Sequence, residues 1–198
     1  MMLQSVTNTR KLRVLEEGRE IPIAQSKYEI STLMNFLRDK SISTAMEIGI
    51  SDGGTTLLLA DLVGNAGMVY ALDICFSRKK YSGLKLSNRI TEIEGDSHSQ
   101  DIKDNVYRRI GSGSLGFLFI DGDHSHEGVK DDFNSYSPLV SNNGWIALHD
   151  IRDTPHHRRL GCFVCDFWNE IKDRYQSFEI LDPEDESRKG IGVIKYEC

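Results

Sequence analysis

The 198-residue sequence predicts an α/β fold in which parallel strands form one sheet with helices on both faces. Short apolar segments with strand character alternate along the chain with segments of helical length. The segment Leu115–Asp121 is apolar up to its final aspartate, as expected of a strand covered on both faces. Glycines and polar residues cluster directly after several of these strands, where open α/β sheets bind ligands.

The first predicted element is an amphipathic helix from Ser26 to about Lys40. Its apolar residues recur two to four positions apart, at Tyr28, Ile30, Leu33, Met34 and Leu37.

Strands and helices are then expected in turn. The predicted strands are Ala45–Gly49, Met68–Asp73, Ile90–Glu94, Leu115–Asp121, Trp145–Asp150, Phe178–Leu181 and Ile191–Tyr196. The predicted helices between them are Thr55–Leu62, Glu127–Tyr136 and about Cys162–Tyr175. Right-handed crossovers would place these helices on the two faces of the sheet.

The start of the chain differs in composition from the rest. Residues 1–25 are polar and mixed in charge, and Glu16-Glu17-Gly18-Arg19 is typical of a turn between two short extended segments. We therefore expect an N-terminal arm over residues 1–25 and a single domain over residues 26–198.

Charge and composition argue against several classes of protein. The 24 Lys and Arg against 30 Asp and Glu give a net charge of −6, which does not suit a protein that binds nucleic acid. Apolar stretches such as Leu57–Ala60 are far shorter than the roughly 20 residues that cross a bilayer, and the start has no apolar core of a signal peptide. Four cysteines are too few for a disulfide framework. We expect a cytoplasmic protein that binds neither nucleic acid nor membrane.

The turn after the first predicted strand, Glu47-Ile-Gly49-Ile-Ser51-Asp-Gly53-Gly-Thr55, has three interpretations. A dinucleotide-binding turn would need glycine at position 51, so that the backbone can approach a pyrophosphate. A hydrolase elbow would use Ser51 with Asp121 and His149, but such an elbow normally follows several strands. The third is a turn that binds S-adenosylmethionine, with Glu47 facing the positively charged amino-acid end and glycines close to the ligand.

Polar residues also follow the next two strands. Asp73 ends the second strand, where a carboxylate can accept hydrogen bonds from ribose hydroxyls. Asp96 and Ser97 follow the third strand, where an adenine ring would lie. Each residue alone is also compatible with helix capping.

Taken with the segments Phe119–Phe133 and Gly144–Asp150, these motifs resemble class I S-adenosylmethionine-dependent methyltransferases of the methyltransferase domain 24 type. That group is similar to metal-dependent small-molecule O-methyltransferases and to cephalosporin hydroxylase-like proteins. The resemblance covers roughly residues 44–175. It implies a Rossmann-like, doubly wound, mostly parallel seven-stranded sheet with an antiparallel last strand. It also implies cofactor contacts from Glu47, Gly49, Gly53, Thr55, Asp73, Asp96, Ser97 and Asp121.

A cluster of carboxylates and histidines is expected at the ends of the fourth and fifth strands. Asp121, His149 and Asp150 correspond to the metal ligands of the metal-dependent relatives, and suit Mg²⁺ or Mn²⁺. The sequence departs from those relatives at His149, where they carry Asp or Glu, and a metal-free polar pocket is the alternative. His124 is the first candidate for the base that deprotonates the acceptor, and His126 is the second.

The segment after the fifth strand is predicted to be a flexible lid, Ile151–Leu160, whose basic residues meet an anionic substrate. Cys162 and Cys165 with His156 and His157 could suggest zinc, but the spacing does not provide a second ligand pair and both cysteines lie on an apolar helix.

Together these features favour a methyltransferase that uses S-adenosylmethionine and acts on a hydroxyl of a small molecule. N-methylation, a non-catalytic nucleoside-binding module and an NAD-linked oxidoreductase are the alternatives. The sequence does not identify the methyl acceptor, and a homodimer is an open expectation.

Overall fold

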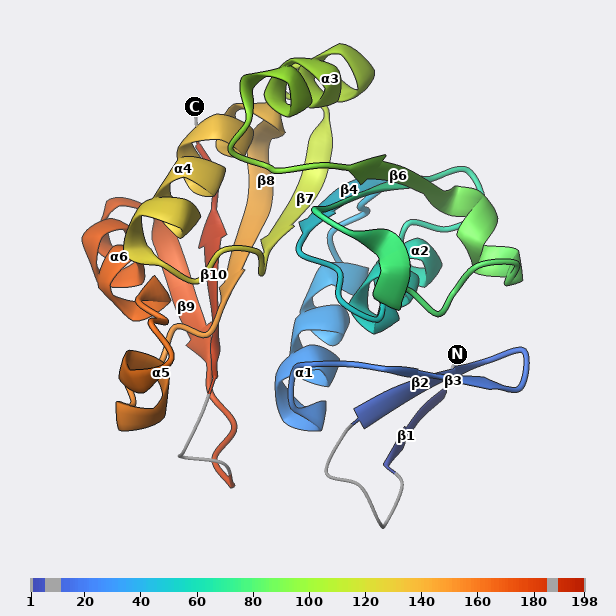
Figure 1. Cartoon of the computed structure of the whole chain (residues 1–198), viewed down its shortest axis with the longest axis horizontal. Coiled ribbons are helices and arrows are strands. Elements are labelled where there is room, and N and C mark those ends of the chain that lie inside the picture. Colours follow the sequence, from blue (N-terminus) through green and yellow to red (C-terminus); the bar gives the residue numbers. More distant parts are fainter. Residues whose placement is uncertain (1, 6–11, 185–188, 198) are drawn as a thin grey trace.

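The computed structural model describes residues 2–5, 12–184 and 189–197, with a seven-stranded sheet at its centre (Figure 1). The strands lie in the order β6-β5-β4-β7-β8-β10-β9, and β10 runs antiparallel to both of its neighbours. Their bounds are β4 (Thr44–Ile48), β5 (Met68–Asp73), β6 (Ile90–Glu94), β7 (Leu115–Ile120), β8 (Val140–His149), β9 (Gln176–Ile180) and β10 (Ile191–Lys195). This confirms the predicted mostly parallel sheet with its inserted antiparallel last strand.

Helices cover both faces of the sheet. One face packs against α1 (Lys27–Arg38) and α2 (Gly54–Leu62). The other packs against α3 (Gln100–Ile110), α4 (His126–Tyr136) and α6 (Val164–Ile171). Figure 1 shows α4 and α6 together on the side of the sheet away from α1. The remaining helices are short: α5 (Pro155–Arg159), and 3-10 turns at Phe76–Arg78, Lys85–Arg89, Ser137–Leu139 and Lys172–Arg174.

Strand β7 shows why the central strands are apolar. Its alternate residues Phe117 and Phe119 belong to the core on the α1 and α2 face. Leu118 and Ile120 belong to the core on the opposite face. All four are fully buried or nearly so, and consecutive side chains of a strand point to opposite faces.

The N-terminal segment forms a small antiparallel sheet of β1 (Met2–Ser5), β2 (Leu12–Glu16) and β3 (Arg19–Pro22). A tight turn joins β2 to β3, with Glu17 and Gly18 both at positive φ. Val14 and Ile21 are fully buried in the same core as α1 and α2. The described part of the arm predicted over residues 1–25 therefore packs against α2, within the core on that face of the main sheet.

The structure differs from the sequence predictions at several elements. Helix α3 was not predicted, because its mean hydropathy is low and few of its residues are buried. Strand β8 begins at Val140 rather than Trp145, and the last predicted helix ends at Ile171 before a 3-10 turn. Within the described residues, no helix has the length and apolar character needed to span a membrane.

Candidate functional site

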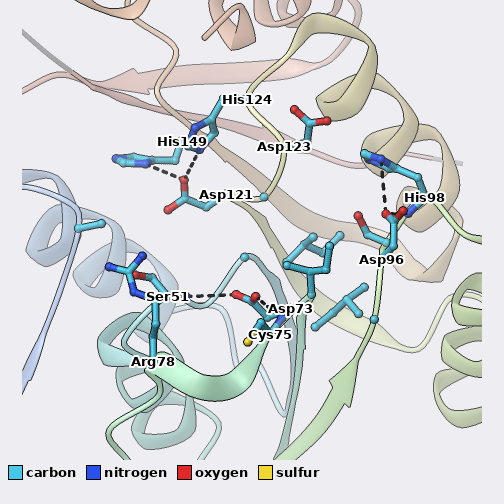
Figure 2. Close-up of a pocket in the computed structure, with 18 of the residues that line it drawn as sticks. Ser51, Asp73, Cys75, Arg78, Asp96, His98, Asp121, Asp123, His124 and His149 are labelled. Carbon is cyan, nitrogen blue, oxygen red and sulfur yellow. Dashed lines mark hydrogen bonds and ion pairs between the residues drawn. The ribbon is translucent and has the colours of Figure 1, made fainter. Parts of the chain in front are cut away.

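A cavity of about 730 Å³ opens at the carboxyl ends of the parallel strands (Figure 2). It lies at the point where the strand order changes direction, because the chain passes from β4 to β5 and β6 on one side and to β7 and β8 on the other. Its wall is formed by residues that follow five strands, among them Gly49, Ser51, Asp73, Ile74, Cys75, Asp96, Ser97, His98, Asp121, His124, His149 and Asp150.

Gly49 brings the ends of β4 and β7 together. Its φ is +82°, and a Cβ atom there would lie 2.2 Å from the carbonyl oxygen of Asp121, so a side chain cannot be accommodated. Gly53 is the left-handed N-cap of α2, and a Cβ atom there would meet the ring of Tyr81 at 2.2 Å. Gly49 therefore lines the cavity, whereas Gly53 shapes the turn behind it.

Glu47 does not line the cavity. Its side chain is buried on the α2 face and accepts a hydrogen bond from the hydroxyl of Thr56 at 2.5 Å. Burial raises the pKa of Glu47 well above its ordinary range. Alternation along β4 directs Glu47 to the same face as Ala45, but Glu47 lies within the strand rather than after it, and α2 covers its carboxylate there. The structure thus does not bring Glu47 to the place where the sequence suggested a ligand contact.

Thr55 also lies outside the cavity wall, but it is linked to it by Gln25. The Thr55 hydroxyl donates to Gln25 Oε1 at 2.8 Å, and Gln25 Nε2 donates to Asp121 Oδ2 at 2.7 Å. Sequence reasoning did not identify Gln25, because it lies in the arm and belongs to no motif. The arm therefore helps to orient Asp121.

Asp73 stands at the tip of β5 and organises the glycine turn. Its Oδ2 accepts the backbone N–H groups of Ile50 at 2.8 Å and Ser51 at 3.3 Å, and its Oδ1 accepts that of Cys75 at 2.9 Å. The next residue, Ile74, lines the cavity with 72% of its surface exposed, unlike most large apolar side chains in the described structure. This pair fits a ligand that carries hydroxyl groups as well as a flat apolar ring. The hydroxyl groups would donate to the carboxylate, and the ring would cover the exposed apolar side chain.

The loop after β6 forms the opposite part of the wall. Asp96 Oδ1 accepts the backbone N–H of His98 at 2.9 Å, and Tyr136 of α4 donates its hydroxyl to the carbonyl oxygen of Ser97 at 2.6 Å. Asp96, Ser97 and His98 all line the cavity, and Figure 2 shows Asp96 and His98 facing each other.

Asp121 lies between two imidazoles, as Figure 2 shows. Its Oδ1 is 3.2 Å from His124 Nε2 and 3.0 Å from His149 Nδ1. Burial opposes the charged form of His149, but Asp121 and Asp150 outweigh it and raise the pKa of His149 to about 9. The hydrogen bond to Asp121 raises the pKa of His124. Burial would raise the pKa of Asp121, yet the two histidines hold it well below its ordinary value.

Asp150 adds a second carboxylate to this cluster. Its carboxylate lies 3.7 Å from His124 Nε2, 3.6 Å from His149 Nδ1 and 3.6 Å from His157 Nε2. Donor atoms of Asp121, His149 and Asp150 all lie within 4.8 Å of one another, as predicted for a metal-binding set. A second set of His124, Asp150 and Cys162 is equally compact. The sequence analysis weighed Cys162 as a zinc ligand with Cys165 and the histidines at 156 and 157, and favoured a place in the core of an apolar helix.

His126 lies apart from the cavity wall. Its imidazole is 2.6 Å from Glu170 and 3.0 Å from Glu127, and the hydrogen bond to Glu170 is the main cause of its raised pKa. Being the first residue of α4, it points toward α6 rather than toward the strand ends. Of the two histidines proposed as the base, only His124 lines the cavity.

The segment predicted as a flexible lid contains helix α5 instead. Thr154 caps this helix by accepting the N–H of His157 at 3.1 Å, and Pro155 occupies its first turn. Arg158, expected to meet an anionic substrate, forms ion pairs with Asp153 at 2.7 Å and Asp166 at 2.6 Å. The sequence prediction of a loop missed this helix, although Thr154-Pro155 is a helix start signal.

A family model described as "Methyltransferase domain" matches residues 46–151, more than half of the chain. An uncharacterized protein of Acanthamoeba polyphaga mimivirus is 29% identical over 123 residues, which are 58% of this chain and 54% of that protein. The chain thus spans about half the length of this curated relative.

Two solved structures are similar in fold. The O-methyltransferase TomG from Streptomyces achromogenes, in complex with SAM, has a TM-score of 0.68 at 16% identity, over 88% of this chain and 82% of that chain. The O-methyltransferase from Bacillus cereus, in complex with SAH, has a TM-score of 0.64 at 16% identity, over 87% of this chain and 82% of that chain. At this identity the likeness establishes the fold alone.

Proposed function

The chain belongs to this family of methyltransferase domains, and from that premise we propose that it transfers a methyl group from S-adenosylmethionine to a hydroxyl of a small molecule. The observation that carries the choice of donor is the charge of the cavity. Five aspartates line it, namely Asp73, Asp96, Asp121, Asp123 and Asp150. They outnumber the positive charges of the wall, which come from Arg78, Lys189 and the protonated His149. This balance attracts a sulfonium and an ammonium, and it repels the pyrophosphate of a dinucleotide.

The nucleoside end of the donor would lie between the tips of β5 and β6. A carboxylate offers about four acceptor positions, and backbone amides occupy three on Asp73, which leaves capacity for a ribose hydroxyl. Ile74 would cover one face of the adenine, while Asp96 and Ser97 would meet its edge. These assignments keep Asp73, Asp96 and Ser97 from the sequence analysis, and add Ile74.

The acceptor hydroxyl would be deprotonated by His124. This imidazole is held by Asp121 at 3.2 Å, and 40% of its side chain is exposed at the cavity. An acid that orients the base and stabilises its protonated form is a common arrangement in proton transfer. Because the hydrogen bond to Asp121 raises the pKa of His124, the neutral form that can accept a proton is reached at a higher pH than in a free histidine.

The donor set fits a divalent cation. Asp121, His149 and Asp150 offer two carboxylates and one imidazole, and Asp150 Oδ1 is a buried oxygen without a hydrogen-bond partner among the described residues. Mg²⁺ or Mn²⁺ held there would lower the pKa of an acceptor hydroxyl. Alignment by the cavity wall would contribute further, since fixed geometry can supply on the order of 7–11 kcal/mol of a barrier.

Ligand binding and turnover test this proposal separately. Thermal shifts with S-adenosylmethionine, S-adenosylhomocysteine, NAD and NADP, each with and without Mg²⁺, should show stabilisation by the two sulfur compounds only. Transfer of a labelled methyl group to a panel of small hydroxylated and amino compounds then distinguishes O- from N-methylation. Stabilisation by NAD or NADP alone would overturn the choice of donor, and undiminished activity after exhaustive chelation would remove the metal.

A further inference from the structure

Asp132 of α4 is a fully buried carboxylate that the site described so far does not use. Within the part of the chain that the structure describes, no backbone N–H donates to either of its oxygens, and its ion-pair partner is the imidazole of His98. Burial raises the pKa of Asp132 to about 6, so the group is charged at neutral pH in spite of its surroundings. A buried charged carboxylate lowers the stability of the folded state, and we therefore looked for a contribution of Asp132 to the cavity.

Both oxygens of Asp132 lie directly behind the cavity wall. Oδ1 is 3.3 Å from Nε2 of His98. Oδ2 lies 3.3 Å from the position that a Cβ atom on Gly122 would take. His98 and Gly122 both line the cavity, on the side where the proposed function places the adenine.

His98 connects this buried acid to the rim of the cavity. Its Nε2 also lies 3.2 Å from the carbonyl oxygen of Gly128, so two acceptors on α4 face the same ring nitrogen. Its Nδ1 lies 3.7 Å from Oδ1 of Asp96, which also accepts the backbone N–H of His98 at 2.9 Å. The imidazole is therefore clamped between a buried carboxylate and a carboxylate at the rim.

We propose that Asp132 is a positioning residue for the base-binding side of the cavity, acting through His98 on Asp96. Asp132 and the Gly128 carbonyl oxygen keep a proton on Nε2 and hold the ring against α4. The ring in turn fixes the orientation of Asp96, which is the acceptor available to the exocyclic amine of adenine. This inference rests on the proposed function, because it assumes that an adenine nucleoside occupies the cavity.

The neighbouring residue offers a matched control. Asp131 is on the same helix but paired with Lys103 at 2.8 Å, and its side chain is 41% exposed. Asp132→Asn keeps the size of the side chain and removes its charge, and Asp131→Asn makes the same change one residue away. We therefore compare wild type, Asp132→Asn, Asp131→Asn and His98→Gln.

Three measurements separate positioning from a merely structural role. Calorimetry at neutral pH gives the dissociation constants of S-adenosylhomocysteine, adenosine and inosine. Thermal unfolding without ligand gives the stability of each variant. Steady-state kinetics separates the KM for S-adenosylmethionine from kcat.

We expect Asp132→Asn to raise the dissociation constant of S-adenosylhomocysteine about tenfold and to reduce the preference for adenosine over inosine. It should also raise the KM for S-adenosylmethionine with little change in kcat. Its unfolding temperature should be equal to or above that of the wild type, because the cost of burying the charge of Asp132 exceeds what its ion pair with His98 returns. His98→Gln should reproduce the loss of affinity. A variant that combines Asp132→Asn with His98→Gln should lose little more affinity than either single variant.

The proposal is overturned if Asp132→Asn binds S-adenosylhomocysteine as tightly as Asp131→Asn does, or if its affinity and unfolding temperature fall together. A wild-type protein that binds no adenosine compound would instead contradict the proposed function itself.

Discussion

Ile74 allows the placement of the nucleoside to be tested without disturbing the fold. The side chain is 72% exposed and lines the cavity, so it makes few contacts that a substitution could remove from the unliganded protein. If an adenine covers it, Ile74→Ser removes apolar surface from the complex alone. The variant should therefore weaken binding while leaving the unfolding temperature of the free protein within normal scatter.

The expected size follows from the exposed fraction. Complete burial of an isoleucine side chain contributes about 1.5–3 kcal/mol. A ring that covers about half of the 72% still exposed would contribute about 0.5–1 kcal/mol, which is a roughly two- to fivefold increase in the dissociation constant. Isothermal titration calorimetry with S-adenosylhomocysteine resolves a change of this size.

Leu160 provides the matched control, because it is 70% exposed and does not belong to the cavity wall. Leu160→Ser removes the same kind of surface at another place and should leave the dissociation constant unchanged. Equal affinities for wild type and Ile74→Ser, or equal losses for both variants, would refute the placement of the base on Ile74.

Four further outcomes follow from the site. Asp73→Ala should raise the dissociation constant of S-adenosylhomocysteine about tenfold or more in calorimetry, because a hydrogen bond to a charged group contributes about 1.5–3 kcal/mol. Near-normal affinity would argue against a ribose hydroxyl bound to Asp73. His124→Ala should lower kcat by about 10²–10⁴ with little change in cofactor affinity, and a variant that retains full turnover would exclude it as the base. Because the pKa of His149 is about 9 when folded and about 6.5 when unfolded, its stabilisation is complete below pH 6.5 and is lost as the pH rises through 9. Urea unfolding should show that the free energy of unfolding falls by on the order of 2–3 kcal/mol between these two pH values. His149→Gln should remove most of this pH dependence. Glu47→Gln should keep its cofactor affinity and be at least as stable at neutral pH, because burial disfavours the charged carboxylate; a tenfold loss of binding would restore Glu47 as a ligand contact.

The features that could be predicted from the sequence are those that depend on residues close together along the chain. The apolar run of β7 and the glycine with positive φ at position 49 can be identified from neighbouring residues alone, since burial on two faces and a tight turn each restrict residue type. The same logic located Asp73 and Asp121 at strand ends.

The features that sequence could not supply depend on contacts between distant segments. Gln25 reaches Asp121 across 96 positions, and nothing in its surroundings distinguishes it from another polar residue of the arm. Glu47 was expected to contact the ligand, but it lies within β4 rather than after it, and its buried carboxylate accepts a hydrogen bond from Thr56. Ile74 is typical of a strand end in sequence, and only its exposure in the fold marks it.

The insertion of β10 between β8 and β9 determines which strand covers the edge of β8. Ile191 is the register partner of His149, so the backbone that carries this histidine is completed by a strand that follows every other strand along the chain. The backbone of β8 therefore gains its second neighbouring strand, on the edge that carries His149, only when β10 joins the sheet.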